Sequence, residues 1–361
     1  MSRAATCRRR PMPPSLSTLA PWAMGLLACL SLGVAQAAPE AASAGSPPAL
    51  ADVSAPAHWL RLMGQAARQS NYEGTVMIST AGRSSSVQVS HRVQGDAQFE
   101  RMEPLDGPVR QIYRHNEDIQ ILWPQKKTAL LQQRGALLGV PRQWAQVDER
   151  ALDVYQIDLL GLQRWAGHQA MVLQLRPRDQ FRYGQRVWAE QRSGLVLRAE
   201  TLAPSGQVLE WTAFTQLSLG PSAARGWDMP DAKSMAQWRW VRSELRKTSL
   251  DQEGWRVSDL PPGFRLLTCV RRSTAGLPPS LAASEPAAHA SDVVQAIFGD
   301  GVTHVSVFIE PYDARRHAQE MMLAQGATQT LKRRVGDWWL TVVGDVPAAT
   351  VVRFASALQR P

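Results

Sequence analysis

The chain has 361 residues, of which 44% are hydrophobic and 20% charged, and its formal net charge is +9 at pH 7. This length is enough for two domains. Outside an N-terminal cluster the basic residues are dispersed, so the charge does not indicate nucleic-acid binding. The mild excess that remains without that N-terminal cluster is compatible with anionic lipid headgroups or an acidic peptide as partners.

The first 37 residues have the pattern of an export signal. A basic start with Arg3 and the Arg triplet at 8–10 precedes an uncharged run and an Ala-Gln-Ala cleavage pattern ending at Ala37. Prolines shorten the apolar run below the roughly 20 residues that a spanning helix needs. We therefore expect cleavage near Ala37, rather than lipid attachment at Cys29, and a flexible leader at 38–52. Removing four Arg and no acid would leave the mature chain at +5, with Cys269 as its one thiol, expected to be buried.

Residues 53–220 are expected to form a domain made mostly of antiparallel strands. An amphipathic helix with Trp59, Leu60 and Met63 on one side comes first, and alternation of apolar and polar residues then predicts nine to eleven strands. Gly-centred turns at 81–82 and 95–96 separate neighbouring strands, and a further helical stretch is expected at 139–152. This order predicts an open β half-barrel whose concave side is covered by helix.

Several of these strands carry apolar residues on one face, which we expect to be the concave one. Each residue alone is explained as ordinary core, but an apolar hollow with few polar groups also suits acyl chains. The resulting candidate lipid-binding set is Val76, Ile78, Val87, Val89, Ile119, Ile121, Trp123, Leu195, Leu197, Leu209 and Trp211.

Residues 221–250 are the candidate linker between two domains. If the stretch WRWVRSELRK at 238–247 is helical, Arg239, Arg242 and Arg246 share a face. That basic stripe is the candidate partner-binding surface, although an exposed linker helix is the simpler explanation.

Residues 251–361 are expected to form a smaller α+β domain. A hairpin should turn at 299–301, a helix should occupy 313–324, and strands should lie around 334 and at 338–343. The last helix is expected from Ala348, just after Pro347, to Leu358. The low-complexity stretch 274–290 is expected to be a mobile loop.

No sequence motif predicts catalysis. The chain lacks G-x-S-x-G, H-E-x-x-H, a Walker loop and a Cys/His cluster. The seven His are scattered, and His91 and His304 lie in predicted strands, where a structural role is expected. Glu100, next to Arg101, is interpreted as a surface charge. We therefore expect no enzymatic activity, no metal and no cofactor.

The amino-acid sequences of several stretches resemble those of the RseB/MucB family of periplasmic regulators, and these stretches extend over nearly the whole mature chain. In order, these are NYEGT (71–75), HRV (91–93), ERMEPLDGPVRQIYR (100–114), PRDQFRYGQRVWAEQRSGLVLRAE (177–200), LPPGF (260–264), FGDGVTHVSVFIE (298–310) and VVGDVPAATVVRFA (342–355). None is a catalytic signature, and the resemblance is weakest at 221–250 and 274–290.

This resemblance implies a mainly β protein, with an N-terminal open half-barrel similar to the lipoprotein carriers LolA and LolB and a smaller C-terminal domain. It implies a periplasmic negative regulator of an envelope-stress sigma factor. Such a protein binds the periplasmic region of a membrane-spanning anti-sigma factor, shields it from proteolysis, and releases it when lipid, lipoprotein or lipopolysaccharide binds.

Two other functions are compatible with the sequence. A lipoprotein or lipid carrier of the LolA class would share the first domain but would not need the second. A structural protein is not excluded by composition, because a fold does not determine a function. The sequence also leaves open whether the protein is a homo-oligomer.

Overall fold

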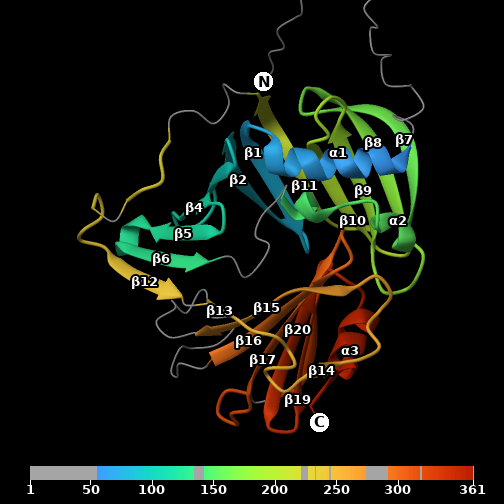
Figure 1. Ribbon diagram of the computed structural model, residues 1–361. Coiled ribbons are helices and arrows are strands. Elements are labelled where there is room, and N and C mark those ends of the chain that lie inside the picture. The colour runs from blue at the N-terminus through green and yellow to red at the C-terminus, as the bar shows by residue number, and fades with distance from the viewer. Residues whose placement is uncertain are drawn as a thin grey trace, which may run out of the picture. The chain divides into compact units, whose positions relative to one another are not determined.

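The computed structural model describes residues 55–133, 142–220, 227–231, 233–243, 245–273, 292–317 and 319–360. Within these ranges the chain forms two large open sheets, a two-stranded ribbon and three α-helices (Figure 1). The prediction of a mainly β fold with open sheets is confirmed. The predicted signal, the leader and the loop at 274–290 lie outside the described residues.

Helix α1 (Pro56–Gln69) is the first described element. It begins at a proline, which suits the first helical turn because its missing N–H would have no partner there. Trp59, Leu60 and Met63 recur at helical spacing, and all three are buried in one core with apolar residues of the first sheet. The predicted amphipathic helix is therefore confirmed.

The first sheet has twelve strands in the order β12-β6-β5-β4-β3-β2-β1-β11-β10-β9-β8-β7. Neighbours pair antiparallel except β12, which pairs parallel with β6. Ala81, Gly82 and Gly95 have positive φ, which confirms the two predicted turns. The strands are β1 (Tyr72–Thr80), β2 (Arg83–Gln94), β3 (Ala97–Pro104), β4 (Gln111–His115), β5 (Asp118–Trp123), β6 (Thr128–Gln133), β7 (Tyr155–Trp165), β8 (His168–Pro177), β9 (Gly184–Glu190), β10 (Val196–Leu202), β11 (Val208–Leu219) and β12 (Arg239–Ser243).

Short helical segments connect parts of this sheet. A 3-10 turn, η1 (Pro124–Lys126), joins β5 to β6, and η2 (Arg142–Gln146) and α2 (Ala151–Val154) precede β7. The single helix expected at 139–152 is thus two short pieces within the described residues. Trp144 of η2 and Val154 of α2 are buried in the same core as α1.

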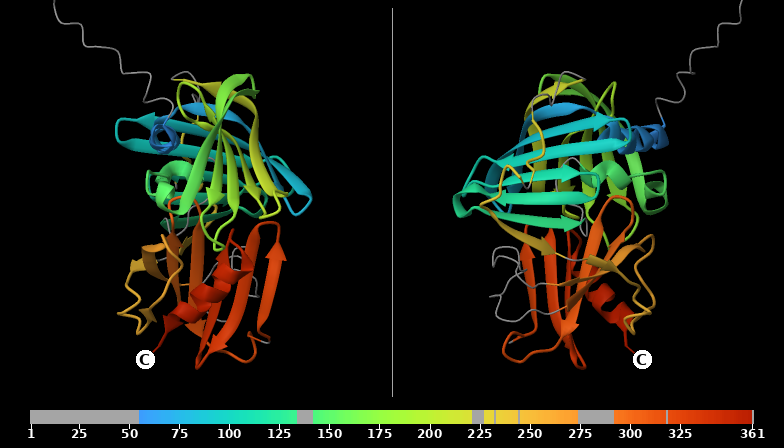
Figure 2. Two further views of the ribbon diagram at one scale, coloured as in Figure 1. Left: turned by 90° about the vertical axis from the view of Figure 1, so that its right-hand side faces the viewer. Right: turned by 60° about the vertical axis from the view of Figure 1, so that its left-hand side comes forward.

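The two faces of the first sheet are covered by different segments. Core residues of β7 to β10 pack with α1, whereas Tyr113, Leu122 and Ala129 on β4 to β6 pack with apolar residues of the segment 227–240. Figure 2 shows this yellow segment crossing strands β2 to β6. The indole of Trp227 donates a hydrogen bond to Ser90 Oγ at 2.9 Å. The described part of the candidate linker up to Trp240 is therefore packed against the first sheet.

The second sheet has seven strands in the order β13-β15-β16-β17-β20-β19-β18. Helix α3 (Ala348–Ala357) packs on β19 and β20, as predicted for the last helix. Val305, Val307 and Phe354 lie at the centre of this second core. The strands are β13 (Leu245–Lys247), β15 (Arg265–Ser273), β16 (Asp292–Gly299), β17 (His304–Pro311), β18 (Met321–Gln325), β19 (Thr328–Val335) and β20 (Trp338–Gly344), and the ribbon consists of β14 (Arg256–Val257) and β21 (Leu358–Gln359).

The predicted helix at 313–324 is wrong. Met321 to Gln325 form the edge strand β18, which pairs antiparallel with β19. Pairing with a strand that follows a two-residue turn stabilises the extended form, which outweighs the helical preference of Met, Leu and Ala. The predicted hairpin turn at 299–301 is confirmed between β16 and β17. In the described part of the chain, no helix has the length and apolar character to cross a membrane.

Candidate functional site

A continuous apolar row crosses one face of the first sheet from β2 to β12. Strand register aligns one residue on each neighbouring strand, because antiparallel and parallel partners at one level share a face. The row is Val89, Met102, Ile112, Ile121, Leu130 and Val241. Ile112 packs in two buried clusters, which makes the face continuous from β1 to β12.

Eight of the eleven candidate lipid-binding residues lie on this face. Ala66 of α1 belongs to one of its clusters, so the face is on the same side of the sheet as the helix. The eight are Val76, Ile78, Val87, Val89 and Leu195 in one cluster and Ile119, Ile121 and Trp123 in the other.

The other three residues belong to neither cluster of this face. Leu197 packs with Val172 and Trp188. The sequence neighbours of these two residues pack under α1, so Val172 and Trp188 face the opposite side of the sheet. Trp211 lies against the Arg198 guanidinium, as Trp188 does, so it shares that opposite face. Leu209 belongs to none of the buried clusters of the described residues. The shared-face prediction for Leu197 was wrong because a bulge between Val196 and Arg198 breaks the alternation.

The eight residues are largely covered by protein atoms in this structure. Val76, Val89 and Ile121 are each no more than 4% exposed, while Ile78, Val87 and Trp123 are half-buried. An acyl chain would therefore need the covering segments to move, and lipid binding by this face stays a prediction.

The predicted basic stripe does not form. Residues 239–243 are strand β12 and residues 245–247 are strand β13 of the other sheet, so the helix expected at 238–247 is wrong. Strand alternation places Arg239 and Arg242 on opposite faces, and Arg246 lies in the second sheet. Val241 explains the outcome, since it completes the apolar row beside Leu130. Partner binding by these arginines stays a prediction.

The titratable residues weighed as catalytic have structural contacts. His91 is fully buried, stacks on Tyr72, and its Nδ1 lies 2.7 Å from the backbone oxygen of Ser70. The sequence-based interpretation of Glu100 as a surface charge is wrong. Its side chain is 1% exposed and pairs with Arg114 at 3.0 Å. No group of three or more His, Cys, Asp or Glu suited to a metal occurs among the described residues.

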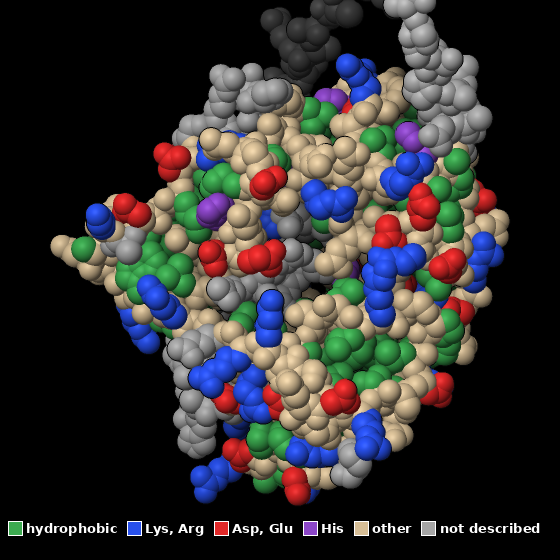
Figure 3. Space-filling model, in the orientation of Figure 1, with side chains coloured by type: hydrophobic (Ala, Val, Ile, Leu, Met, Phe, Trp, Pro, Cys, Tyr) green, Lys and Arg blue, Asp and Glu red, His purple; other side chains and the backbone are tan. Residues whose placement is uncertain are grey.

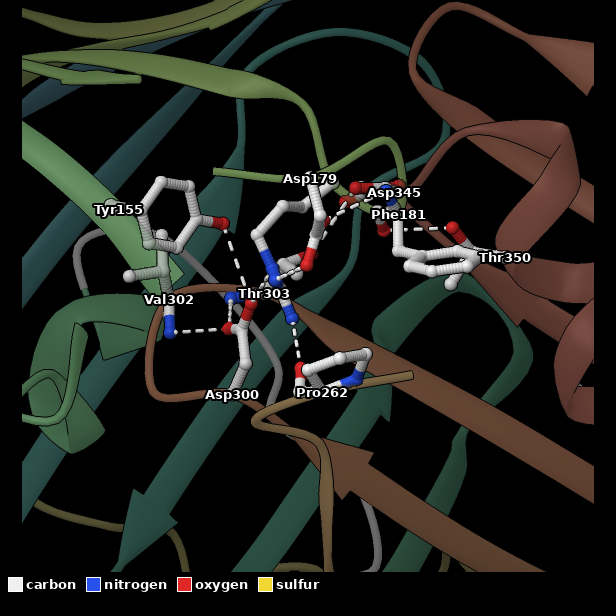
Figure 4. Close-up of polar contacts among 10 residues, drawn as sticks. Tyr155, Asp179, Phe181, Pro262, Asp300, Val302, Thr303, Asp345 and Thr350 are labelled. Atoms are coloured by element: carbon white, nitrogen blue, oxygen red, sulfur yellow. Dashed lines mark hydrogen bonds and ion pairs between the residues drawn. The ribbon is translucent and has the colours of Figure 1, made fainter. Parts of the chain in front are cut away.

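A buried polar cluster joins the two sheets, and no sequence pattern predicts it. Arg182, between β8 and β9, donates from Nε to Asp300 Oδ2 at 2.8 Å, and both side chains are fully buried. Arg182 also donates to Asp179 and to the backbone oxygen of Pro262. Asp300 also accepts hydrogen bonds from the Tyr155 hydroxyl and from the backbone N–H groups of Val302 and Thr303 (Figure 4).

Further contacts secure the same junction. Thr350 of α3 donates to the Phe181 backbone oxygen at 2.7 Å, and Val302 is buried in the core under α1. Burial next to the negative charge of Asp300 raises the pKa of Tyr155 well above its usual value, so this phenol stays protonated as a hydrogen-bond donor. Arg182 and Asp300 lie in two of the stretches that resemble the RseB/MucB family, 177–200 and 298–310. Because 118 positions separate them, the sequence alone does not indicate that they form a pair.

An acidic pair lies elsewhere between the two sheets. Glu210 of β11 is near Asp345 and accepts hydrogen bonds from the backbone of Ala327 and the side chain of Thr201. Burial, with a smaller contribution from Asp345, raises the pKa of Glu210 to about 7. Its protonation near neutral pH therefore depends on contact between the sheets.

Two family models match successive parts of this chain. The model for the MucB/RseB N-terminal domain matches residues 55–238, and that for the MucB/RseB C-terminal domain matches residues 249–359. The sigma factor AlgU regulatory protein MucB of Pseudomonas aeruginosa is 30% identical over 321 residues, covering 83% of this chain and 90% of the relative. The sigma-E factor regulatory protein RseB of Haemophilus influenzae is 22% identical, covering 82% and 89%.

Solved structures agree with the sequence matches. The MucA/MucB complex of Pseudomonas aeruginosa contains a chain that is 28% identical, with a TM-score of 0.59, covering 86% of this chain and 99% of that one. A crystal structure of MucB with MucA(peri) gives a TM-score of 0.57 at 28% identity, covering 84% and 97%. With both domain models matched in order over most of its length, this chain belongs to the MucB/RseB family.

Proposed function

We propose that this protein is a periplasmic negative regulator that binds the periplasmic region of a membrane-spanning anti-sigma factor and shields it from proteolysis. The presence of both MucB/RseB domains, at 55–238 and 249–359, carries the proposal. A similar chain crystallised with periplasmic MucA supports the class of partner. The export pattern ending at Ala37 supports the compartment.

We further propose that lipid, lipoprotein or lipopolysaccharide favours release by inserting acyl chains at the apolar face around Val89, Ile112 and Ile121. The alignment of six apolar residues across six strands supports this, since their surface is continuous. Burying apolar area contributes about 25 cal/mol per Å², so a few methylenes shift a two-state equilibrium several-fold. The ligand acts only if it binds the released form more tightly than the bound form.

The test is a proteolysis assay with the periplasmic region of the anti-sigma factor encoded in the same genome. Cleavage by the initiating protease should slow when the mature protein is added and should recover when lipid A is added. Cleavage that is equally fast with and without the protein would contradict shielding. Slowing that lipid A leaves unchanged would contradict lipid-induced release alone.

A lipid or lipoprotein carrier is the second candidate, favoured by the apolar face because that face lies within the first sheet alone. The second sheet has its own core and is joined to the first through Arg182 and Asp300, which a carrier would not need. Transfer of lipoprotein from this protein to a membrane acceptor, with no binding of the anti-sigma segment, would favour the carrier.

A further inference from the structure

A polar recess of about 680 Å³ is lined by residues from the domain of the first sheet and from the second sheet. None of the candidate lipid-binding residues is part of its lining. Arg61, Gln65 and Arg68 contribute from α1, where spacings of four and three residues place them on one side of the helix. Arg150 contributes from the segment before α2, and Arg265 contributes from the start of β15. Four guanidinium groups therefore surround one recess.

Two of these four positive charges are not balanced by a carboxylate among the described residues. Arg61 and Arg150 each pair with an acid of the adjacent segment 148–149. Arg68 donates to a neutral backbone carbonyl, and Arg265 is exposed and forms no ion pair within the described part of the chain. The recess thus keeps an excess of positive charge, although Figure 3 shows basic and acidic side chains interspersed over the face that it draws.

The size and lining of the recess favour a peptide over a small anion. A volume of about 680 Å³ is much larger than a single phosphate group. The amides of Gln65, Gln69 and Gln146 both donate and accept hydrogen bonds, which is what the backbone of an extended peptide requires. Guanidinium groups bind carboxylates in a bidentate manner, so acidic side chains suit Arg68 and Arg265.

We propose that this recess binds an acidic stretch of a partner polypeptide. Resting on the proposed function, the stretch belongs to the periplasmic region of the anti-sigma factor. The site is distinct from the basic stripe expected from sequence, whose residues Arg239, Arg242 and Arg246 do not share a face.

The recess depends on the junction between the sheets. Arg265 lies on the second sheet, whereas Arg68 lies on α1, so both line one site only while the sheets stay joined. The fully buried pair Arg182 and Asp300 joins them, and His304 Nε2 lies 3.4 Å from Gln146 Oε1 at the recess wall. Loss of the junction should therefore weaken peptide binding without altering any recess residue.

The experiment compares two exposed arginines by charge reversal. Arg265→Glu changes the recess, whereas Arg242→Glu changes the expected stripe, and each alters the net charge equally. The probes are a fluorescent hexaglutamate peptide and the periplasmic region of the anti-sigma factor, measured by anisotropy with the mature protein. Gln65→Glu, an isosteric change at an exposed helix position, is a second recess variant that should leave folding intact.

We expect both recess variants to bind both probes about tenfold or more weakly, and Arg242→Glu to change binding about twofold or less. Added salt should weaken binding to the unmodified protein. Equal losses for Arg265→Glu and Arg242→Glu would overturn the assignment. So would binding of inorganic phosphate in preference to hexaglutamate, because the recess would then be a simple anion site.

The two probes separate this proposal from the proposed function. If hexaglutamate binds in a recess-dependent manner but the anti-sigma region does not bind, the acidic-peptide site stands and the regulator proposal fails. If the anti-sigma region binds the unmodified protein and both recess variants equally well, the regulator proposal stands and the recess proposal fails.

Discussion

Arg182 and Asp300 form a fully buried ion pair, with Nε of the arginine 2.8 Å from Oδ2 of the aspartate, and they lie in loops that connect strands of different sheets. Burying two charges is costly unless each is hydrogen-bonded, and here Tyr155 and the backbone at 302–303 supply the remaining donors to Asp300. Both buried charges are therefore compensated at the junction.

Removing one member of this pair should be strongly destabilising. Arg182→Met leaves the buried carboxylate of Asp300 unpaired, and we expect it to lower the free energy of unfolding by about 3–5 kcal/mol. Arg150→Met, which breaks the exposed ion pair with Asp148, should cost less than about 1 kcal/mol. Chemical denaturation followed by tryptophan fluorescence measures both.

The double variant Arg182→Met/Asp300→Asn distinguishes the ion pair from simple packing. It removes both charges but keeps a side-chain oxygen that can accept from the backbone at 302–303, so we expect it to recover most of the stability lost by Arg182→Met. A double variant as unstable as the single one would show that the hydrogen bonds to neighbouring groups, and not the unpaired charge, dominate.

The stability of the folded protein should fall as the pH rises through 7. The pKa of Glu210 is raised from 4.5 to about 7, so the folded chain binds this proton more tightly than the unfolded chain does. The resulting stabilisation is complete below about pH 4.5 and is lost as the pH rises through 7. Because Glu210 is only partly buried, we expect a loss of about 1 kcal/mol.

Glu210→Gln tests the origin of this pH dependence. The amide resembles the protonated acid, so the variant should be more stable than the unmodified protein at pH 8 and should have a flatter profile between pH 5 and 8. Glu117→Gln, at an exposed turn, is the control. A slope that survives in Glu210→Gln would assign the effect to another group.

Close packing of α1 against the turn before β10 should make Gly194 difficult to replace. A Cβ at this position would lie 2.5 Å from Leu62 Cγ, and the φ of +77° is itself unfavourable for other residues. Gly206 has a similar φ of +85° but no atom within 4 Å of the added carbon. Thermal melting should therefore show a larger loss of stability for Gly194→Ala than for Gly206→Ala. Equal losses would contradict the predicted clash with Leu62.

Lipid binding, if it uses the apolar face, should distinguish two adjacent residues of β1. Ile78 is on the α1 side of the sheet with Val76, whereas Met77 points to the opposite side, and both are half-buried. Ile78→Asp should weaken binding of lipid A at least about fivefold, while Met77→Asp should not. Fluorescence titration of the two folded variants measures this, and equal effects would argue against the face.

Local patterns predicted much of the fold. Pro56 and the spacing of Trp59, Leu60 and Met63 indicate α1, and the positive-φ turns fall where glycine lies between alternating runs. These features depend only on neighbours in the sequence, and so they are visible without tertiary information.

Long-range pairing explains what the sequence did not reveal. Residues 239–243 have helical charge spacing, but parallel pairing with β6 makes them a strand and separates Arg239 from Arg242. Similarly, the bulge beside Leu197 changes its face without any local signal. The contact of Arg182 with Asp300 joins elements far apart in the chain, and alternation carries no information about such partners.

Direct titration of the mature protein with the periplasmic region of the anti-sigma factor from the same genome tests the central claim. We expect saturable binding with a Kd of about 1 μM or tighter, since a regulator must hold its partner at cellular concentrations. Absence of saturation up to about 100 μM, with a protein that melts cooperatively, would contradict the assignment as a regulator.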